Sequence, residues 1–229
     1  MSYAALTARP VAVGAQNGCV PATLPPDSLR TTRLPRSRRV LLLVDFINPL
    51  NFPGAENLAP AAVLAARATA RLKQGLAAEG VPTIYANDNY GVWQSDFHSQ
   101  VSACLGMDGA PAEMANLLYP QASDLTLLKP RHSAFFASPL EMLLSEMQAK
   151  ELIICGLATD LCIQLTAMDA FLREFEIWVP SDCTAAESAE AKDASLAYMA
   201  SALRCDTAAA TPRARAGKPN PKTKREAHA

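Results

Sequence analysis

Short apolar runs alternate with longer stretches of helical periodicity between residues 40 and 206. Continuous apolar runs are typical of strands in a parallel sheet, because helices cover both faces of such strands. The predicted strands are residues 40–46, 81–86, 124–129, 152–155 and 176–180, with a short sixth strand at 203–206.

Helices are predicted between these strands. The longest is residues 61–79, where apolar residues recur at helical spacing and Gly80 ends the helix. Ser138 is expected to cap a helix that begins at Pro139 and ends near Lys150. The stretch NDNYGVWQSDF after the second strand is interpreted as a loop. The other predicted helices are residues 111–119, 159–174 and 185–202.

This order of elements predicts an α/β fold. Strands that alternate with amphipathic helices form a parallel sheet with helices on both faces, connected by right-handed crossovers. We therefore expect a Rossmann-like three-layer αβα sandwich with a mainly parallel sheet of about six strands. No Gly-x-Gly-x-x-Gly or phosphate-loop pattern follows a strand, so the nucleotide-binding versions of this architecture lose their main support.

Composition divides the chain into three parts. Half of the 229 residues are hydrophobic, which is enough for one sizeable core, and one domain is predicted at residues 36–207. Residues 1–35 are rich in proline and lack a sustained period, so they are interpreted as a flexible N-terminal arm. Residues 208–229 are of low complexity and basic, and are interpreted as a disordered tail.

Charge and cysteine usage narrow the expected partners and location. The formal net charge of −1 combines an acidic core, −11 over residues 40–206, with two basic ends of +5 each. An acidic core argues against nucleic-acid binding, and no apolar run is long enough to span a membrane. The six cysteines show no paired metal-ligand spacing and no secretory signal is evident, so a reduced, cytoplasmic protein without a bound metal is predicted.

Cys162 is the first candidate for chemistry. Gly156 ends the strand at 152–155, and Thr159 stands at an N-cap position, so Cys162 is expected near the N-terminus of the following helix. Unpaired backbone N–H groups and the helix dipole at such a position favour the nucleophilic thiolate. Most cysteines in strand-turn-helix units are inert core residues, so position alone leaves both interpretations open.

Two charged residues end other apolar runs. Asp45 closes the strand at 40–46, and Lys129 closes the strand at 124–129. The carboxyl ends of parallel strands meet at one edge of the sheet, where such folds place their ligand sites. We therefore expect Asp45, Lys129 and Cys162 to share one crevice.

The segments around these residues resemble the isochorismatase-like cysteine hydrolase family, which has an Asp, Lys and Cys triad. The resemblance covers residues 40–206 and rests on VDFINPL, LLKPRHSAFFASPL, GLATDLCIQLTAMDA and SDCTAAE. It implies the same three-layer fold, a non-proline cis peptide between Leu157 and Ala158, and an oxyanion hole formed by the backbone N–H groups of Ala158 and Cys162. It also implies a homo-oligomer, either a dimer or a tetramer, and no cofactor.

The resemblance implies a reaction in which Cys162 attacks a carbonyl carbon. Asp45 takes the thiol proton and passes it to the leaving nitrogen, while Lys129 stabilises the charges of both. We favour hydrolysis of an amide or ureido C–N bond of a small molecule through a thioester. Two alternatives remain: the enol-ether cleavage of true isochorismatases, which does not need a thiolate, and a catalytically dormant binding or scaffold module.

Substrate contacts are expected from loops that border the crevice. Related nicotinamidases carry an Asp-x-His metal motif after the second strand, where this chain reads NDNYG, so a metal and nicotinamide are both doubtful here. His132 is interpreted either as a pocket residue or as a surface or supporting histidine. The candidate substrate-binding residues are Phe46, Asn48, Asn87, Asp88, Trp93 and Phe135.

Overall fold

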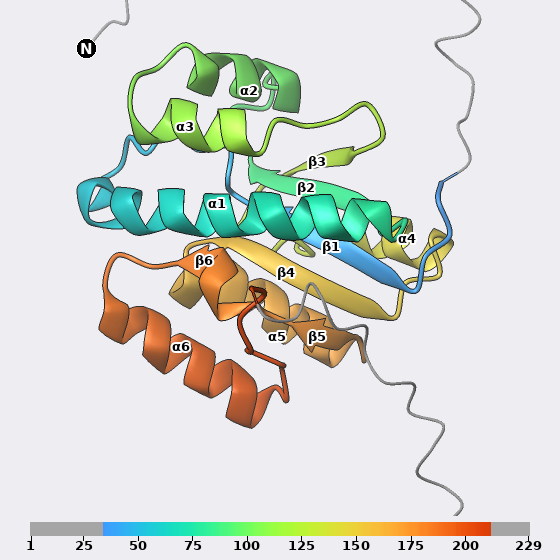
Figure 1. Cartoon of the computed structure of the whole chain (residues 1–229). Coiled ribbons are helices and arrows are strands. Elements are labelled where there is room, and N and C mark those ends of the chain that lie inside the picture. Colours follow the sequence, from blue (N-terminus) through green and yellow to red (C-terminus); the bar gives the residue numbers. More distant parts are fainter. Residues whose placement is uncertain (1–33, 212–229) are drawn as a thin grey trace, which may run out of the picture. The chain divides into compact units, whose positions relative to one another are not determined.

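The computed structural model describes residues 34–211, which form a parallel sheet covered by helices on both faces (Figure 1). The strand order is β3-β2-β1-β4-β5, and β6 pairs with the end of β4. The chain therefore winds outward from β1 in one direction and then, from β4, in the other. The strands are β1 (Arg39–Val44), β2 (Thr83–Asp88), β3 (Leu125–Lys129), β4 (Glu151–Leu157), β5 (Glu176–Trp178) and β6 (Thr184–Ala185).

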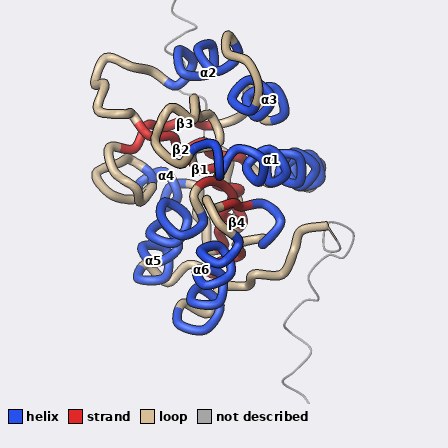
Figure 2. Tube along the Cα trace, turned by 90° about the vertical axis from the view of Figure 1, so that its left-hand side faces the viewer, coloured by secondary structure: helices blue, strands red, loops and turns tan. Residues whose placement is uncertain are grey.

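Alternating residues of the central strand belong to two different cores, which gives the three layers. Leu41 and Leu43 of β1 pack in one apolar cluster with α1, α2 and α3, whereas Val40, Leu42 and Val44 pack in another with α4, α5 and α6. Figure 2 shows α1 and α3 on one side of the sheet and α4 and α5 on the other. The predicted three-layer α/β fold is thus confirmed. The helices are α1 (Ala55–Ala78), α2 (Phe97–Leu105), α3 (Ala110–Leu117), α4 (Leu140–Glu146), α5 (Gln164–Leu172) and α6 (Ala189–Ala202).

Helices α1, α2 and α4 differ from the sequence-based expectation. Helix α4 ends at Glu146 rather than near Lys150, and its N-cap is Pro139 rather than Ser138. Helix α1 begins at Ala55 rather than at residue 61, because Gly54 adopts a left-handed N-cap conformation and Pro60 is accommodated inside the helix. Helix α2 was not predicted. Its N-cap is Asp96, whose carboxylate accepts a hydrogen bond of 2.9 Å from the backbone N–H of Ser99. A single capping residue is a weak sequence signal for a helix. Here Asp96 belongs to the stretch that was interpreted as a loop, so the helix start was not recognised.

The predicted sixth strand at 203–206 is wrong. Asp206 forms only an isolated bridge with Trp178. The sixth strand is instead the two-residue β6, which lies where the helix at 185–202 was expected to begin and pairs with Gly156 and Leu157. Helix α6 consequently begins at Ala189, where the Ser188 hydroxyl accepts a hydrogen bond of 3.1 Å from the N–H of Ala191.

The C-terminal boundary of the domain also needs correction. Residues 208–211 were assigned to a disordered tail, but they pack on the domain. The Asp182 carboxylate accepts a hydrogen bond of 2.7 Å from the N–H of Ala210, and the indole N–H of Trp178 donates one of 2.8 Å to the carbonyl of Ala208. The predicted flexible arm, apart from Leu34 and Pro35, and the rest of the predicted tail lie outside the described residues.

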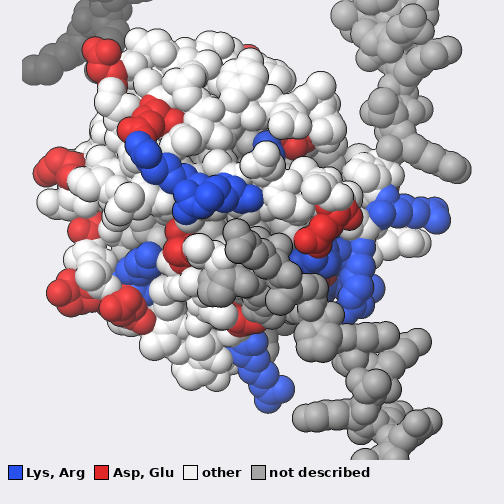
Figure 3. Space-filling model, viewed as in Figure 1, with Lys and Arg blue, Asp and Glu red and all other residues white. Residues whose placement is uncertain are grey.

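The described surface carries charges of both signs. On the face that α1 and α3 cover, acidic and basic side chains are interspersed without one sign dominating (Figure 3). One such pair joins Arg67 of α1 to Glu113 of α3. Within residues 34–211, no helix has both the length and the apolar character needed to cross a membrane.

Candidate active site

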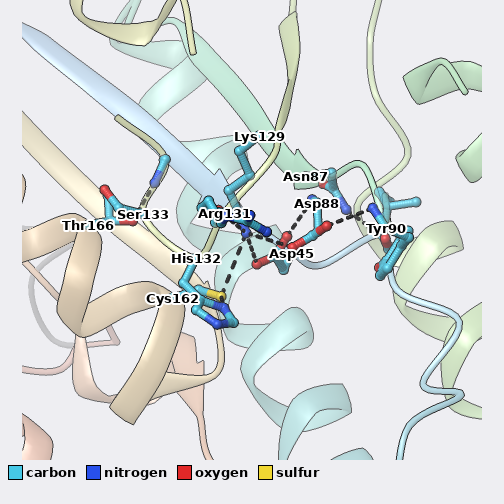
Figure 4. Close-up of polar contacts among 12 residues, drawn as sticks. Asp45, Asn87, Asp88, Tyr90, Lys129, Arg131, His132, Ser133, Cys162 and Thr166 are labelled. Carbon is cyan, nitrogen blue, oxygen red and sulfur yellow. Dashed lines mark hydrogen bonds and ion pairs between the residues drawn. The ribbon is translucent and has the colours of Figure 1, made fainter. Parts of the chain in front are cut away.

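Three strand ends converge at one edge of the sheet. Asp45 directly follows β1, Lys129 is the last residue of β3, and Cys162 lies in η2 (Thr159–Ile163), the π-helical turn after β4. Strands β1 and β4 are neighbours at the point where the chain changes direction across the sheet, which is where open α/β sheets place their ligand sites. The structure therefore brings the three predicted residues together, as Figure 4 shows.

The turn between β4 and η2 depends on Gly156. Its φ is +146°, and a Cβ at this position would lie 2.0 Å from the carbonyl oxygen of Val44. Only glycine permits this close approach of β4 to the end of β1. The peptide bond between Leu157 and Ala158 is cis, as the family resemblance implied.

Thr159 does not act as the predicted N-cap. The N-cap residue of η2 is Ala158, and the Thr159 hydroxyl instead contacts the Thr184 hydroxyl at 2.9 Å. Thr184 also donates a hydrogen bond of 2.8 Å to the carbonyl of Gly156. These hydrogen bonds hold the start of η2 against β6. They therefore help to position Cys162, which lies three residues after Thr159.

Lys129 is the centre of the polar network. Its side chain is fully buried, and Nζ lies 2.8 Å from Oδ2 of Asp45 and 3.5 Å from Oδ2 of Asp88. It also donates a hydrogen bond of 3.2 Å to the carbonyl of Arg131 and one of 3.7 Å to Sγ of Cys162. The second oxygen of Asp45 accepts a hydrogen bond of 2.7 Å from the N–H of Asp88. A buried ammonium is stable only with ion pairs and hydrogen bonds of this kind. Through them Lys129 connects the carboxylate of Asp45 to the thiol of Cys162.

Burial and charge set the protonation of this pair. Burial raises the pKa of Asp45, and the neighbouring ammonium of Lys129 offsets part of this rise. Burial opposes the charge on Lys129, but Asp45, Cys162 and Asp88 together outweigh this effect and raise the pKa of Lys129. The lysine therefore stays charged, while the aspartate is a stronger base than an exposed carboxylate.

The expected low pKa of Cys162 is contradicted. Burial raises the pKa of this thiol, and the nearby charge of Asp45 raises it further, while Lys129 only partly compensates. The position near a helix N-terminus does not lower the pKa, because the sulfur is shielded from water and lies near the carboxylate of Asp45. Cys162 is thus a neutral thiol in the resting site, with a proton acceptor beside it.

His132 is the second nitrogen neighbour of the sulfur. Its Nδ1 lies 3.7 Å from Sγ of Cys162. The residue is exposed and lines two adjoining cavities of about 470 and 430 Å³. The sequence analysis did not decide whether His132 is a pocket residue. Its position three residues after Lys129 was the one indication that it lies near the site. Arg131 and Phe136 also line both cavities, and neither was among the predicted substrate-binding residues.

Two of the six predicted substrate-binding residues border these two cavities. Asp88 and Trp93 line the larger one, in which Trp93 is 81% exposed. Phe46 is fully buried in the core, and Asn48 is a turn residue whose amide oxygen accepts a hydrogen bond from the N–H of Leu50. These two were predicted only from their closeness to Asp45, and neither lines the two cavities.

Asn87 and Phe135 also do not line these two cavities. Asn87 is fully buried, and its amide donates a hydrogen bond of 2.6 Å to the carbonyl of Ile47, which anchors the loop after β1. Phe135 packs in the core against Phe175, with ring centroids 6.1 Å apart. Its neighbour Phe136, and not Phe135, lines the two cavities.

The predicted oxyanion donors lie in the same turn. Ala158 precedes η2, and its carbonyl accepts hydrogen bonds from the N–H groups of Leu161 and Ile163. The role of the N–H groups of Ala158 and Cys162 stays a prediction. Within residues 34–211, no group of three or more His, Cys, Asp and Glu side chains is placed to hold a metal ion.

Comparison with known proteins assigns the family. Residues 39–211 match the Isochorismatase domain, and the chain belongs to this family of hydrolases. It is 34% identical over 168 residues to the uncharacterized isochorismatase family protein YaaI of Bacillus subtilis, which covers 73% of this chain and 92% of that protein. A shorter stretch of 80 residues is 36% identical to the ureidoacrylate amidohydrolase RutB of Enterobacter sp., covering 35% of each chain.

Solved structures with the same fold agree. The nicotinamidase of Staphylococcus aureus superposes with a TM-score of 0.59 at 19% identity, over 75% of this chain and 98% of that one. The N-carbamoylsarcosine amidase of Thermoplasma acidophilum gives 0.58 at 22% identity, over 80% and 100% of the two chains. These structural similarities confirm the fold, while the domain match and the similarity to YaaI confirm the family that the sequence motifs indicated.

Proposed function

We propose that this protein hydrolyses an amide or ureido C–N bond of a small molecule, with Cys162 as nucleophile. The observation that carries the proposal is the linked geometry of three residues from separate segments. Nζ of Lys129 lies 3.7 Å from Sγ of Cys162 and 2.8 Å from Oδ2 of Asp45. This arrangement supplies a nucleophile, a base and a fixed positive charge in one water-poor site.

The protonation states define the first step. Cys162 holds its proton until a carbonyl carbon is in place, and Asp45 then accepts the proton as the C–S bond forms. Lys129 stays positively charged and offsets the negative charge that moves between the sulfur and the carboxylate. The backbone N–H groups of Ala158 and Cys162 are the proposed donors to the oxyanion. Loss of the amine leaves a thioester on Cys162, which water hydrolyses.

The relatives support C–N bonds as the target. One sequence relative is named an amidohydrolase, and two structural neighbours are named an amidase and a nicotinamidase. The cleavage of an enol ether needs no thiolate. It would not explain why a thiol, a lysine and an aspartate lie so close to one another. The amide or ureido substrate is therefore preferred over an enol ether and over a dormant module.

A substrate panel tests the proposal. Primary amides, N-carbamoyl amino acids and isochorismate are incubated with the wild type and with Cys162→Ala, and product release is measured. Turnover of at least one C–N substrate is expected, with a loss of about 10³-fold or more in the variant, because the nucleophile cannot be replaced. Turnover of isochorismate alone, unaffected by the variant, contradicts the proposal. The cytoplasmic location and the dimeric or tetrameric state stay predictions.

A further inference from the structure

An apolar groove runs along the exposed side of α5, the helix that follows the nucleophile. Leu165, Met168 and Leu172 line it at spacings of three and four residues, which places them on one face of the helix. Phe136, from the loop after β3, lines it too, and its volume is about 430 Å³. Leu165 is 36% exposed, Phe136 59% and Leu172 75%. Apolar side chains left in contact with water beside a reactive group are typical of a ligand-binding groove.

Two polar residues that line the groove already have partners within the protein. The Ser133 hydroxyl donates a hydrogen bond of 2.5 Å to the Asp169 carboxylate. Arg173 donates one of 2.7 Å to the other oxygen of the same carboxylate. Because these groups satisfy one another, this part of the groove does not require a polar group from a ligand. It therefore favours an apolar segment.

The groove approaches the nucleophile through His132. This residue lines the groove, and its Nδ1 lies 3.7 Å from Sγ of Cys162. Cys162 itself does not line the groove, but Leu165 follows it by three residues, about one helical turn. Leu172 lies roughly 10 Å further along the helix axis, since each residue adds about 1.5 Å. An apolar groove of this length fits an extended chain better than a compact ring.

The geometry around the sulfur indicates which part of a substrate would enter the groove. In Figure 4 Asp45 and Lys129 lie on one side of the sulfur of Cys162, and the imidazole of His132 lies on the other. In the proposed reaction Asp45 passes the thiol proton to the leaving nitrogen, so this nitrogen must lie toward Asp45. The acyl group is bonded to the same carbonyl carbon and points the other way, toward His132 and the groove.

We propose that the apolar groove binds the acyl chain of the substrate, so that the protein hydrolyses amides of straight-chain aliphatic acids. This rests on the proposed function. The carbonyl carbon lies beside Sγ of Cys162, the chain passes His132, and its methylene groups pack first on Leu165 and then on Met168 and Leu172. Each methylene removed from water strengthens binding through the hydrophobic effect.

Binding of amides to folded Cys162→Ala measures the groove without turnover. Acetamide, butanamide, hexanamide and octanamide are titrated by NMR, which suits weak ligands. The dissociation constant is expected to fall about 2- to 4-fold for each added methylene, as partial to full burial of the chain requires.

Matched variants in the same background locate the chain. Leu165→Ser should weaken butanamide and octanamide by about 5-fold, because both chains reach it. Leu172→Ser, at the far end, should weaken octanamide by about 3-fold and leave butanamide unchanged. Leu64→Ser is the control and should change neither, because Leu64 is an exposed leucine of α1 on the other side of the sheet.

Three results decide the outcome. The proposal is overturned if affinity does not depend on chain length, or if Leu165→Ser has no more effect than Leu64→Ser. If Leu165→Ser dissociates an oligomer in sedimentation while chain length has no effect on binding, the groove is an interface between two copies of this chain, and the proposal fails. Binding that depends on chain length, without hydrolysis of any amide or ureido compound by the wild type, contradicts the proposed function and not the groove.

Discussion

The Lys129 ammonium lies 2.8 Å from the Asp45 carboxylate, and both groups are almost completely shielded from solvent. Because water does not solvate either charge, each is stabilised mainly by the other. The pair comes from two strands that are not adjacent, since β2 lies between β1 and β3. The long lysine side chain crosses this distance, which makes the pair a cross-strand link as well as a candidate catalytic unit.

Breaking this ion pair should affect both stability and turnover. Lys129→Met leaves a buried carboxylate unpaired and is expected to lower the free energy of unfolding by about 3 to 5 kcal/mol. Asp45→Asn should also destabilise, and the double variant should be more stable than the sum of the two losses predicts. Urea unfolding measures these values, with Lys150→Met, an exposed lysine, as the control.

Turnover per folded molecule separates catalysis from structure in the same variants. Lys129→Met and Asp45→Asn should each lose nearly all hydrolysis, with little further loss in the double variant, because groups that serve one step are not additive. A purely structural ion pair would reduce stability and leave turnover of the folded fraction intact. Such a result in Asp45→Asn removes the aspartate from the mechanism.

The reactivity of Cys162 should depend on pH in a specific direction. Because burial and Asp45 raise the pKa of the thiol, its alkylation by iodoacetamide in the free protein should be slower at pH 7 than in the unfolded chain. The rate should continue to increase above pH 9. Peptide mapping after partial labelling measures this. Preferential labelling of Cys162 at pH 6 to 7 would show a lowered pKa and would contradict the account of the resting site.

Alkaline pH should reduce stability through buried thiols. Burial raises the pKa of Cys205 to about 12, against about 8.5 for an unfolded thiol. The folded state thus retains a proton that the unfolded state releases, so the contribution is full below about pH 8.5 and is lost as pH rises toward 12. Between pH 9.5 and 11, Cys205→Ala should flatten the decline in the free energy of unfolding by up to about 1.4 kcal/mol per pH unit. An unchanged slope would contradict the burial of this thiol.

Gly156 should be the least replaceable glycine near the site. A methyl group there meets the Val44 carbonyl oxygen at 2.0 Å and requires a φ of +146°, so Gly156→Ala should cost about 3 kcal/mol or more. Gly75→Ala is the control, because nothing lies within 4 Å of its added Cβ in α1. This control should stabilise by about 0.5 to 1 kcal/mol. Thermal melts of both variants test the contrast, and equal melting temperatures would show that β4 can separate from β1 without cost.

The sequence predicted those features that depend on local pattern. Apolar runs located the five main strands, and a charge at the end of two of them located Asp45 and Lys129. The two-residue β6 has no such signal, because it is set by its pairing with Gly156 and Leu157. Helix α2 was missed for a similar reason, since its capping residue lies in a stretch rich in turn residues.

The site details depend on distances that a sequence does not carry. Phe135 and Phe136 are adjacent and chemically identical, and only the packing of Phe135 against Phe175 decides which of them faces the cavities. The pKa of Cys162 was predicted in the wrong direction because the helix position is local, whereas burial and Asp45 are tertiary effects. The contact of His132 with the sulfur is likewise a property of the folded loop.

The most direct test of the central claim is to trap the acyl group on Cys162. The wild type is quenched in acid during turnover of the best C–N substrate, digested and analysed by mass spectrometry. The account predicts the acyl mass on the peptide that contains Cys162, and neither adduct nor turnover in Cys162→Ala. Undiminished hydrolysis by folded Cys162→Ala would contradict it.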